Sequence, residues 1–221
     1  MGNRRRIRRY RNQLILLIAF CSLFGQAEYQ ITTIPLNSFM LSTHNGFEPI
    51  DNNSKYLVSY LQYPDQINLL SIDYNKINFS LLNYGLFEDK VDQIINNQFH
   101  AYEGLINYNF KKRIFDLFSL KTSIGGIFSK MESYTSIALI VNTNLRTTIP
   151  TSNIKLGFAL KNLGVVLKNY TENKQQLPME LECYILKKIN DNMIIGYNLD
   201  YLFYIDHMQH IILTQFKINQ S

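Results

Sequence analysis

Glu180 and Glu182 are the residues of this chain whose type and spacing come closest to an acid–base pair. They stand in a run of alternating polar and apolar residues, so on a β-strand both side chains point to one face, about 7 Å apart. Paired carboxyl groups are what glycoside hydrolases use. No other feature of the sequence builds a cleft around this pair. We interpret both residues as solvated glutamates that face a barrel lumen or the base of a loop.

Two histidines, His207 and His210, could hold a metal ion only if they shared a face. They fall in a predicted strand, where residues three apart point to opposite faces. The sequence also contains no nucleophile elbow, phosphate-binding glycine loop, H-E-x-x-H motif or paired C-x-x-C. These patterns predict no catalytic residue, no cofactor and no metal ligand, and therefore a protein that is not an enzyme.

The first 27 residues have the pattern of a secretory signal peptide. Six arginines between Arg4 and Arg11 precede an apolar run from Leu14 to Phe24, and Gly25-Gln26-Ala27 has small residues at the −3 and −1 positions of a cleavage site. The apolar run is too short for a spanning helix. We predict a cleaved leader, residues 1–27, and a mature domain, residues 28–221. A retained signal anchor is the alternative.

Cleavage of the leader would remove Cys21 and leave Cys183 as the one cysteine of the mature chain. A lipoprotein would be modified at Cys21, but Phe20 precedes it where a small residue is expected. The mature chain can form no intramolecular disulfide, although an exported compartment would permit one. We interpret Cys183 as a small apolar residue on a packed or lipid-facing surface.

The net charge of the chain also depends on the leader. Six of the 22 Lys and Arg residues are its arginines, which leaves 16 basic residues against 17 acidic ones, a formal charge of −1 for the mature part. The excess of positive charge that nucleic-acid binding requires is therefore absent from residues 28–221.

From residue 55 onward the chain alternates between apolar and polar residues, the pattern of β-strands. In the clearest stretch, residues 153–185, a strand begins at Ile154, the turn-like Asn162-Leu163-Gly164 interrupts it, a polar tip follows, and a second strand begins at Leu177. Glycines inside strands, at 125, 126 and 157, predict kinks or close backbone approaches. Further strands are expected at Lys55–Tyr63, Ile67–Tyr74, Ile77–Leu82, Tyr102–Phe110, Phe118–Phe128, Thr135–Thr143, Ile195–Phe203 and Met208–Ile218.

This pattern predicts an all-β protein: an antiparallel, up-and-down transmembrane β-barrel of about 10–12 strands of roughly nine to twelve residues. Strands of that length suit a tilted crossing of the membrane. Residues 28–54 have an uncertain fold, with Ile31 to Leu41 either a strand or an inward-folded, plug-like segment. A soluble sandwich or barrel, its apolar face turned inward, shows the same alternation. The strand length and the leader favour the membrane.

Several short motifs share their order and spacing with one family. They are Asn83-Tyr84-Gly85-Leu86-Phe87, Phe99-His100-Ala101-Tyr102-Glu103, the stretch SKMESY at 129–134, LGFALKNLG at 156–164 and LPMELE at 177–182. Together they cover about residues 55–215 and resemble the PorV/PorQ family of outer-membrane β-barrels, its PorQ branch above all, which is related to the FadL-type transporters. The chain departs from the family in two places. Residues 28–54 contain no Asn-Pro-Ala motif, and the chain stops at Phe216 to Ser221 without further hairpins. A shortened barrel, a truncated product and a barrel closed with fewer strands are the alternatives.

The resemblance implies a component of the type IX secretion system of Bacteroidota-like Gram-negative bacteria, held in outer-membrane lipid. It would bind other proteins of the secretion and attachment complex at the cell surface. Because loops on rigid scaffolds carry function, we expect the polar loops Gly85 to Asn97 and Asn169 to Gln176 to form the docking surface. The alternatives are a FadL-like passive transporter of hydrophobic small molecules and a soluble periplasmic β-protein.

Overall fold

The computed structural model describes residues 29–34, 56–91, 94–114, 117–190 and 192–216. The predicted signal peptide, residues 1–27, lies outside these residues, as does most of the segment 28–54. Among the described residues, no helix has the length and hydropathy needed to cross a membrane.

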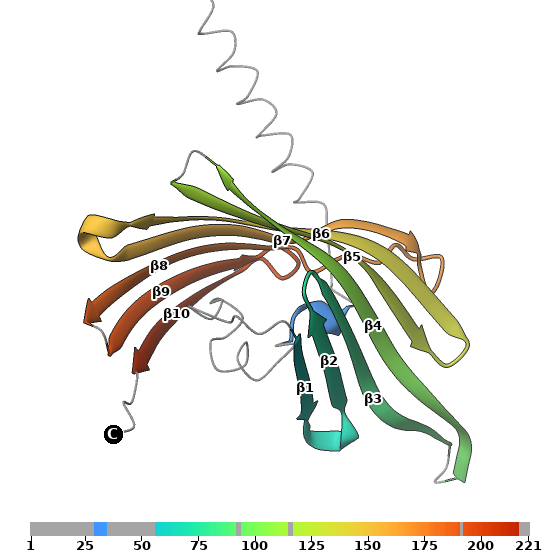
Figure 1. The fold of residues 1–221 in the computed structure, drawn as a ribbon. Helices are drawn as coiled ribbons and strands as arrows, with labels where there is room; N and C mark the ends of the chain where they lie inside the picture. Colours follow the sequence, from blue (N-terminus) through green and yellow to red (C-terminus); the bar gives the residue numbers. More distant parts are fainter. Residues whose placement is uncertain (1–28, 35–55, 92–93, 115–116, 191, 217–221) are drawn as a thin grey trace, which may run out of the picture.

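Nearly all of the described chain lies in one antiparallel sheet (Figure 1). Three short 3-10 helices lie outside the strands: η1 (Gln30–Thr32) before the sheet, η2 (Pro64–Gln66) and η3 (Pro150–Ser152) in connections between strands. Ten strands are present in this part of the chain: β1 (Tyr56–Gln62), β2 (Asn68–Tyr74), β3 (Ile77–Val91), β4 (Ile94–Ile114), β5 (Phe118–Met131), β6 (Tyr134–Ile149), β7 (Ile154–Lys168), β8 (Glu180–Asn190), β9 (Met193–Leu202) and β10 (His207–Phe216).

Each strand pairs with the next one along the chain, so the order in the sheet is that of the sequence, β1 to β10. This confirms the predicted all-β, up-and-down fold, and the number of strands lies within the expected range. The sheet curves strongly and arches around η1 (Figure 1). Within the described residues β1 and β10 are edge strands that do not pair with each other, which agrees with an incomplete barrel.

The two faces of the sheet differ in chemistry. The outer, convex face carries large apolar side chains in the open: Ile106 is 56% exposed, whereas the adjacent Leu105, on the inner face, is 3% exposed. The inner, concave face is rich in buried polar residues. They include Ser71, Asn78, Ser80, Glu103, Asn107, Ser123, Ser129, Ser136, Glu182, Asn198 and Asp200. The apolar face of the alternation is therefore the exposed one, the reverse of a soluble sandwich.

A small apolar core forms where η1 meets the inner face. Tyr29 and Ile31 are fully buried there and pack with residues of β2 to β6: Leu69, Leu82, Leu105, Ile127, Ala138 and Ile140. The Ile31 N–H donates a 2.8 Å hydrogen bond to Glu103 Oε2. For the stretch Ile31 to Leu41, predicted as a strand or an inward-folded segment, the described part, residues 31–34, is folded inward, and the rest lies outside the described residues.

The turn predicted at Asn162-Leu163-Gly164 is wrong, because β7 runs through it. The pairing of β6 with β7 shifts register at this point, and Asn162 has a left-handed φ of 57°. The Asn162 N–H donates to Asn142 Oδ1 at 2.6 Å, and Asn162 Nδ2 donates to the Pro178 carbonyl at 2.9 Å. Asparagine and glycine, which in sequence indicate a turn, here form a β-bulge, since a bulge needs the same backbone freedom.

We expect Asn162→Ala to lower the free energy of unfolding by about 1–3 kcal/mol, because it removes the bond to Pro178 and leaves alanine at a left-handed φ. Asn162→Gly is the matched control: it loses the same bond but tolerates the backbone angle, so it should be the less destabilised of the two. Chemical unfolding in detergent micelles measures both. Wild-type stability of Asn162→Ala would show that the bulge does not depend on this side chain.

The prediction of a loop from Gly85 to Asn97 is also wrong. Strands β3 and β4 continue as a hairpin whose pairing extends from Leu86 opposite His100 to Val91 opposite Ile94. A register shift between Asn83 and Leu86 places Gly85 at φ 85°, and Asn83 Oδ1 accepts the Gly85 N–H at 3.0 Å. A polar sequence can continue a strand because cross-strand backbone bonds do not depend on side-chain polarity.

Of the three strand glycines for which a kink or close approach was predicted, Gly125 and Gly157 mark close approaches and Gly126 does not. A Cβ on Gly125 would lie 1.9 Å from Asn107 Oδ1 and 2.6 Å from the Ile106 carbonyl oxygen, whereas the nearest atom to a Cβ on Gly126 would be 3.9 Å away. A Cβ on Gly157 would lie 2.0 Å from the ring of Tyr184. At positions 125 and 157 the space of a side chain is taken by the neighbouring strand.

These adjacent glycines form a matched pair for an experiment. We expect Gly125→Ala to cost about 1–3 kcal/mol of unfolding free energy, because the new methyl group meets a backbone oxygen that cannot rotate away. Gly126→Ala should stay within about 0.5 kcal/mol of the wild type. Unfolding curves of the two variants, recorded side by side, test this difference. Equal stabilities would contradict the close approach of β4 to β5.

Candidate functional site

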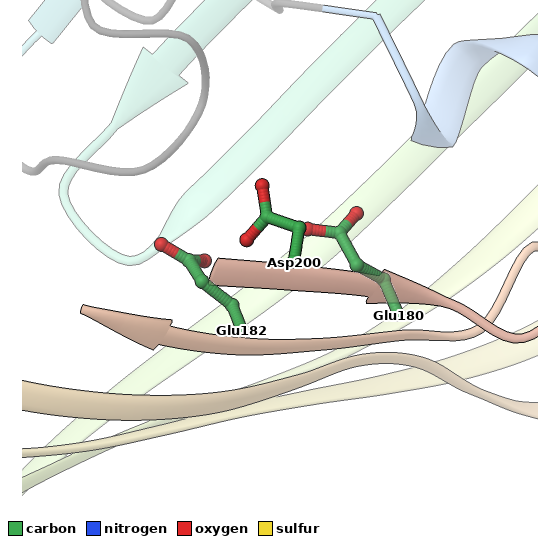
Figure 2. A group of neighbouring side chains, drawn as sticks. All are labelled: Glu180, Glu182 and Asp200. Atoms are coloured by element: carbon green, nitrogen blue, oxygen red, sulfur yellow. The ribbon is translucent and has the colours of Figure 1, made fainter. Parts of the chain in front are cut away.

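The densest group of ionisable side chains lies on the inner face, where β7, β8 and β9 run side by side. Glu180 and Glu182 belong to β8, and Asp200 of β9 stands directly opposite Glu182. One oxygen from each of the three carboxylates lies within 4.8 Å of the others. Figure 2 shows the three side chains rising from the same face of the two strands. The predicted common face of the two glutamates is confirmed.

A lysine on the neighbouring strand partly neutralises these carboxylates. Lys161 of β7 pairs with Glu180 across the strands, and its Nζ lies 2.7 Å from both Glu180 Oε1 and Glu182 Oε2. The Glu182 side chain is 1% exposed, and Asp200 is 4% exposed. Glu182 and Asp200 therefore lie away from solvent, and the glutamates are not the solvated residues that the sequence indicated.

The surroundings of this carboxylate cluster, Glu180, Glu182 and Asp200, contain further polar atoms. Glu182 Oε1 has no hydrogen-bond partner among the described residues, and neither has the side-chain oxygen or nitrogen of Asn198. In the turn after β9, burial and then the negative charge of Glu180 raise the pKa of the Tyr204 hydroxyl above its ordinary value. Among the side chains named here, three carboxylates lie beside one ammonium group, and such an arrangement favours the binding of a cation.

Sequence reasoning found Glu180 and Glu182 but missed Lys161, Asp200 and Asn198. In the sequence, Lys161 is one of the alternating residues of the strand that begins at Ile154, and Asp200 lies 18 residues from Glu182. Their meeting depends on the register of β7 with β8 and of β8 with β9. Register follows from the turns between strands, and the sequence shows these turns less clearly than it shows alternation.

A second polar group on the inner face holds the chain between β7 and β8. Gln175 is 7% exposed, and its Oε1 lies 2.5 Å from Ser136 Oγ and accepts from the Tyr29 hydroxyl at 3.4 Å. The Tyr170 hydroxyl is hydrogen-bonded to Ser129 Oγ. The segment 169–179 therefore folds inward and contacts the N-terminal segment instead of extending away from the sheet.

This inward fold corrects two expectations. The loop Asn169 to Gln176 presents only its tip, Thr171 to Lys174, to the surroundings. The strand expected from Leu177 begins instead at Glu180, because Leu177 packs against the small core and Pro178 is buried. Proline has no N–H to give to a strand ladder, and its carbonyl accepts from Asn162.

Of the remaining residues singled out in the sequence, His210 and Cys183 lie on the outer face, whereas His207 lies on the opposite face of β10, as the spacing of the two histidines predicts. His207 and His210 both belong to β10, and His210 Nδ1 lies 2.6 Å from the Tyr197 hydroxyl. Cys183, a free thiol, lies opposite Phe158 of β7 and Leu199 of β9 in the sheet. The structure brings neither histidine to the carboxylate cluster.

No family model matches the chain, and no curated protein or solved structure matches it.

Proposed function

We propose that this protein is a non-enzymatic outer-membrane β-barrel component that works by binding other proteins. The observation that carries the proposal is the exposed apolar outer face. Side chains such as Ile106, Ile124 and Leu139 are 56%, 51% and 47% exposed, while the same strands bury serines and asparagines on the inner face. Lipid would remove the apolar side chains from water, and this alternation is typical of membrane barrels.

A soluble periplasmic protein would leave this outer face in water. Each strand from β1 to β10 carries exposed apolar side chains, among them Val58, Phe79, Phe128, Phe158 and Ile212. Monomeric soluble proteins rarely expose an apolar patch of more than a few hundred square ångströms, and larger ones mark contact with a membrane or a partner. The chemistry of the two faces therefore supports placement in lipid.

The proposed partners are proteins of the type IX secretion and attachment complex. This part of the proposal rests on the resemblance of the motifs to the PorV/PorQ family. The sheet would act as the membrane anchor, and the connections at its ends as the docking surface. Because the loop 169–179 folds inward, we assign docking to its exposed tip, residues 171–174, and to the end of the β3–β4 hairpin (Figure 1).

The transporter alternative gains no support from the inner face. Transport of hydrophobic molecules needs an apolar path, whereas this face is mostly polar and is filled by η1 and the segment 169–179. The few apolar residues there are packed against Tyr29 and Ile31.

Extraction of the tagged protein from washed outer membranes, followed by identification of what co-purifies, tests the proposal. We expect detergent to be required and secretion-complex proteins to accompany the protein. Release without detergent would contradict the membrane placement. Extraction without any partner, together with uptake of hydrophobic compounds by liposomes containing the protein, would support the transporter instead.

Alanine substitutions in the exposed tip, residues 171–174, test the docking surface. We expect them to reduce partner capture while leaving the unfolding curve unchanged, because the side chains of this tip are exposed. A matching set at residues 150–152 of η3, an exposed connection at the opposite end of the sheet, serves as the control. Undiminished capture by the first set would remove this tip from the docking surface.

A further inference from the structure

We propose that the carboxylate cluster on the inner face binds one divalent cation, calcium by preference. Glu180, Glu182 and Asp200 would supply carboxylate oxygens, and Asn198 the amide oxygen. The inference goes beyond the function proposed above and does not depend on it, since it concerns only the inner face.

The distances within the cluster fit one calcium ion. Calcium binds oxygen atoms at about 2.3–2.6 Å, so two ligands of one ion can lie up to about 5 Å apart. One oxygen from each of the three carboxylates lies within 4.8 Å of the others. Magnesium prefers about 2.0–2.1 Å in a strict octahedron, so it would require the cluster to contract. The all-oxygen set also disfavours metals that prefer nitrogen or sulfur.

Asn198 is the independent observation that points to a ligand. Its side chain is 1% exposed, and neither its oxygen nor its nitrogen has a hydrogen-bond partner among the described residues. It lies two residues before Asp200 on β9, hence on the same inner face, and it pairs with Tyr184, the residue two after Glu182. An unpaired amide buried in this way is costly unless something binds it. The amide therefore belongs to the face on which the cluster would hold a cation.

The charges of the cluster and Lys161 suit a divalent ion. Lys161 donates to Glu180 Oε1 and Glu182 Oε2, while Glu182 Oε1 has no hydrogen-bond partner in the described chain. Taken by themselves, these four side chains, three carboxylates and one ammonium group, sum to two negative charges. Two like charges directly opposite each other on neighbouring strands, Glu182 and Asp200, repel. A divalent cation would neutralise the excess, and Lys161 would share the glutamates with it.

Terbium luminescence tests the proposal on the full chain in detergent micelles. Terbium replaces calcium at oxygen sites, and nearby tyrosines sensitise its emission; Tyr184 and Tyr201 lie on β8 and β9. We expect saturable emission that calcium chloride reverses and that magnesium chloride reverses less well. Asp200→Asn should weaken binding by about tenfold or more. Glu132→Gln, in the exposed turn between β5 and β6, is the control and should bind as the wild type does.

Two further variants keep the test decisive if Asp200→Asn fails to fold. Asn198→Asp adds a carboxylate of the same shape and should tighten terbium and calcium binding. Lys161→Met removes the competing ammonium group, so it should also tighten binding, and calcium should raise its melting temperature more than that of the wild type. Emission that does not saturate, or affinities that none of the three substitutions changes, would overturn the proposal.

Discussion

Replacing Ile106 with arginine should destabilise the protein in lipid vesicles by about 2–4 kcal/mol. Ile106 lies well inside β4 on the outer face, is 56% exposed, and pairs with Phe79 of β3 and Gly126 of β5. If the outer face lies in the hydrocarbon, the guanidinium group loses its water there. If the face is in water, an exposed arginine costs about 0.5 kcal/mol or less. Guanidinium unfolding of the protein in vesicles measures the difference.

Tyr56→Arg is the control for this experiment. Tyr56 is 72% exposed on the same face but is the first residue of β1, at the rim of the sheet, where a charge should cost about 0–1 kcal/mol. We expect a clear gap between the two variants. Equal and small effects would mean that the outer face is not in lipid, and the soluble alternative would then account better for the protein.

Tyr29→Ala should lower the free energy of unfolding by about 3–5 kcal/mol, the range for removal of a large buried aromatic side chain. The Tyr29 ring is fully buried against the inner face, and its hydroxyl bonds to Ser136 and Gln175. Its loss would leave a cavity in the small core and release the segment 169–179 from one of its contacts. Chemical unfolding in micelles gives the stability, and limited proteolysis reports the release of the segment.

Tyr29→Phe separates packing from hydrogen bonding. It keeps the ring and removes only the hydroxyl, so it should cost about 1 kcal/mol. If Tyr29→Ala and Tyr29→Phe are equally and weakly destabilised, the N-terminal segment does not contribute to the fold in the way its burial indicates.

The strands could be predicted from the sequence because alternation is a local property. The residues of β5 and β6, for example, show their faces within any eight-residue window, and their predicted starts, Phe118 and Thr135, lie within one residue of the observed ones. The up-and-down order also follows from short connections between neighbouring strands. Which face meets the surroundings does not follow from alternation, and the exposure of Ile106 beside the buried Leu105 answers that question.

What the sequence could not show depends on contacts between distant segments. The bulge at Asn162 needs Asn142 and the Pro178 carbonyl as partners, so the residue types alone could be interpreted as a turn. The polar loop 169–176 folds inward because Gln175 meets Tyr29 and Ser136. Asp200 joins Glu182 only through the register of β9. Each of these features requires a pairing that local composition does not encode.

The docked N-terminal segment also has a consequence for the timing of folding. Its hydrogen bonds join residues 72, 107 and 146 positions apart: Ile31 with Glu103, and Tyr29 with Ser136 and Gln175. Contacts over such separations close long loops and form slowly, and here their partners lie on β4, on β6 and after β7. We therefore expect the beginning of the described chain to dock late, after most of the sheet exists. A half-assembled sheet would leave that end open to proteases, and a finished sheet would hide it.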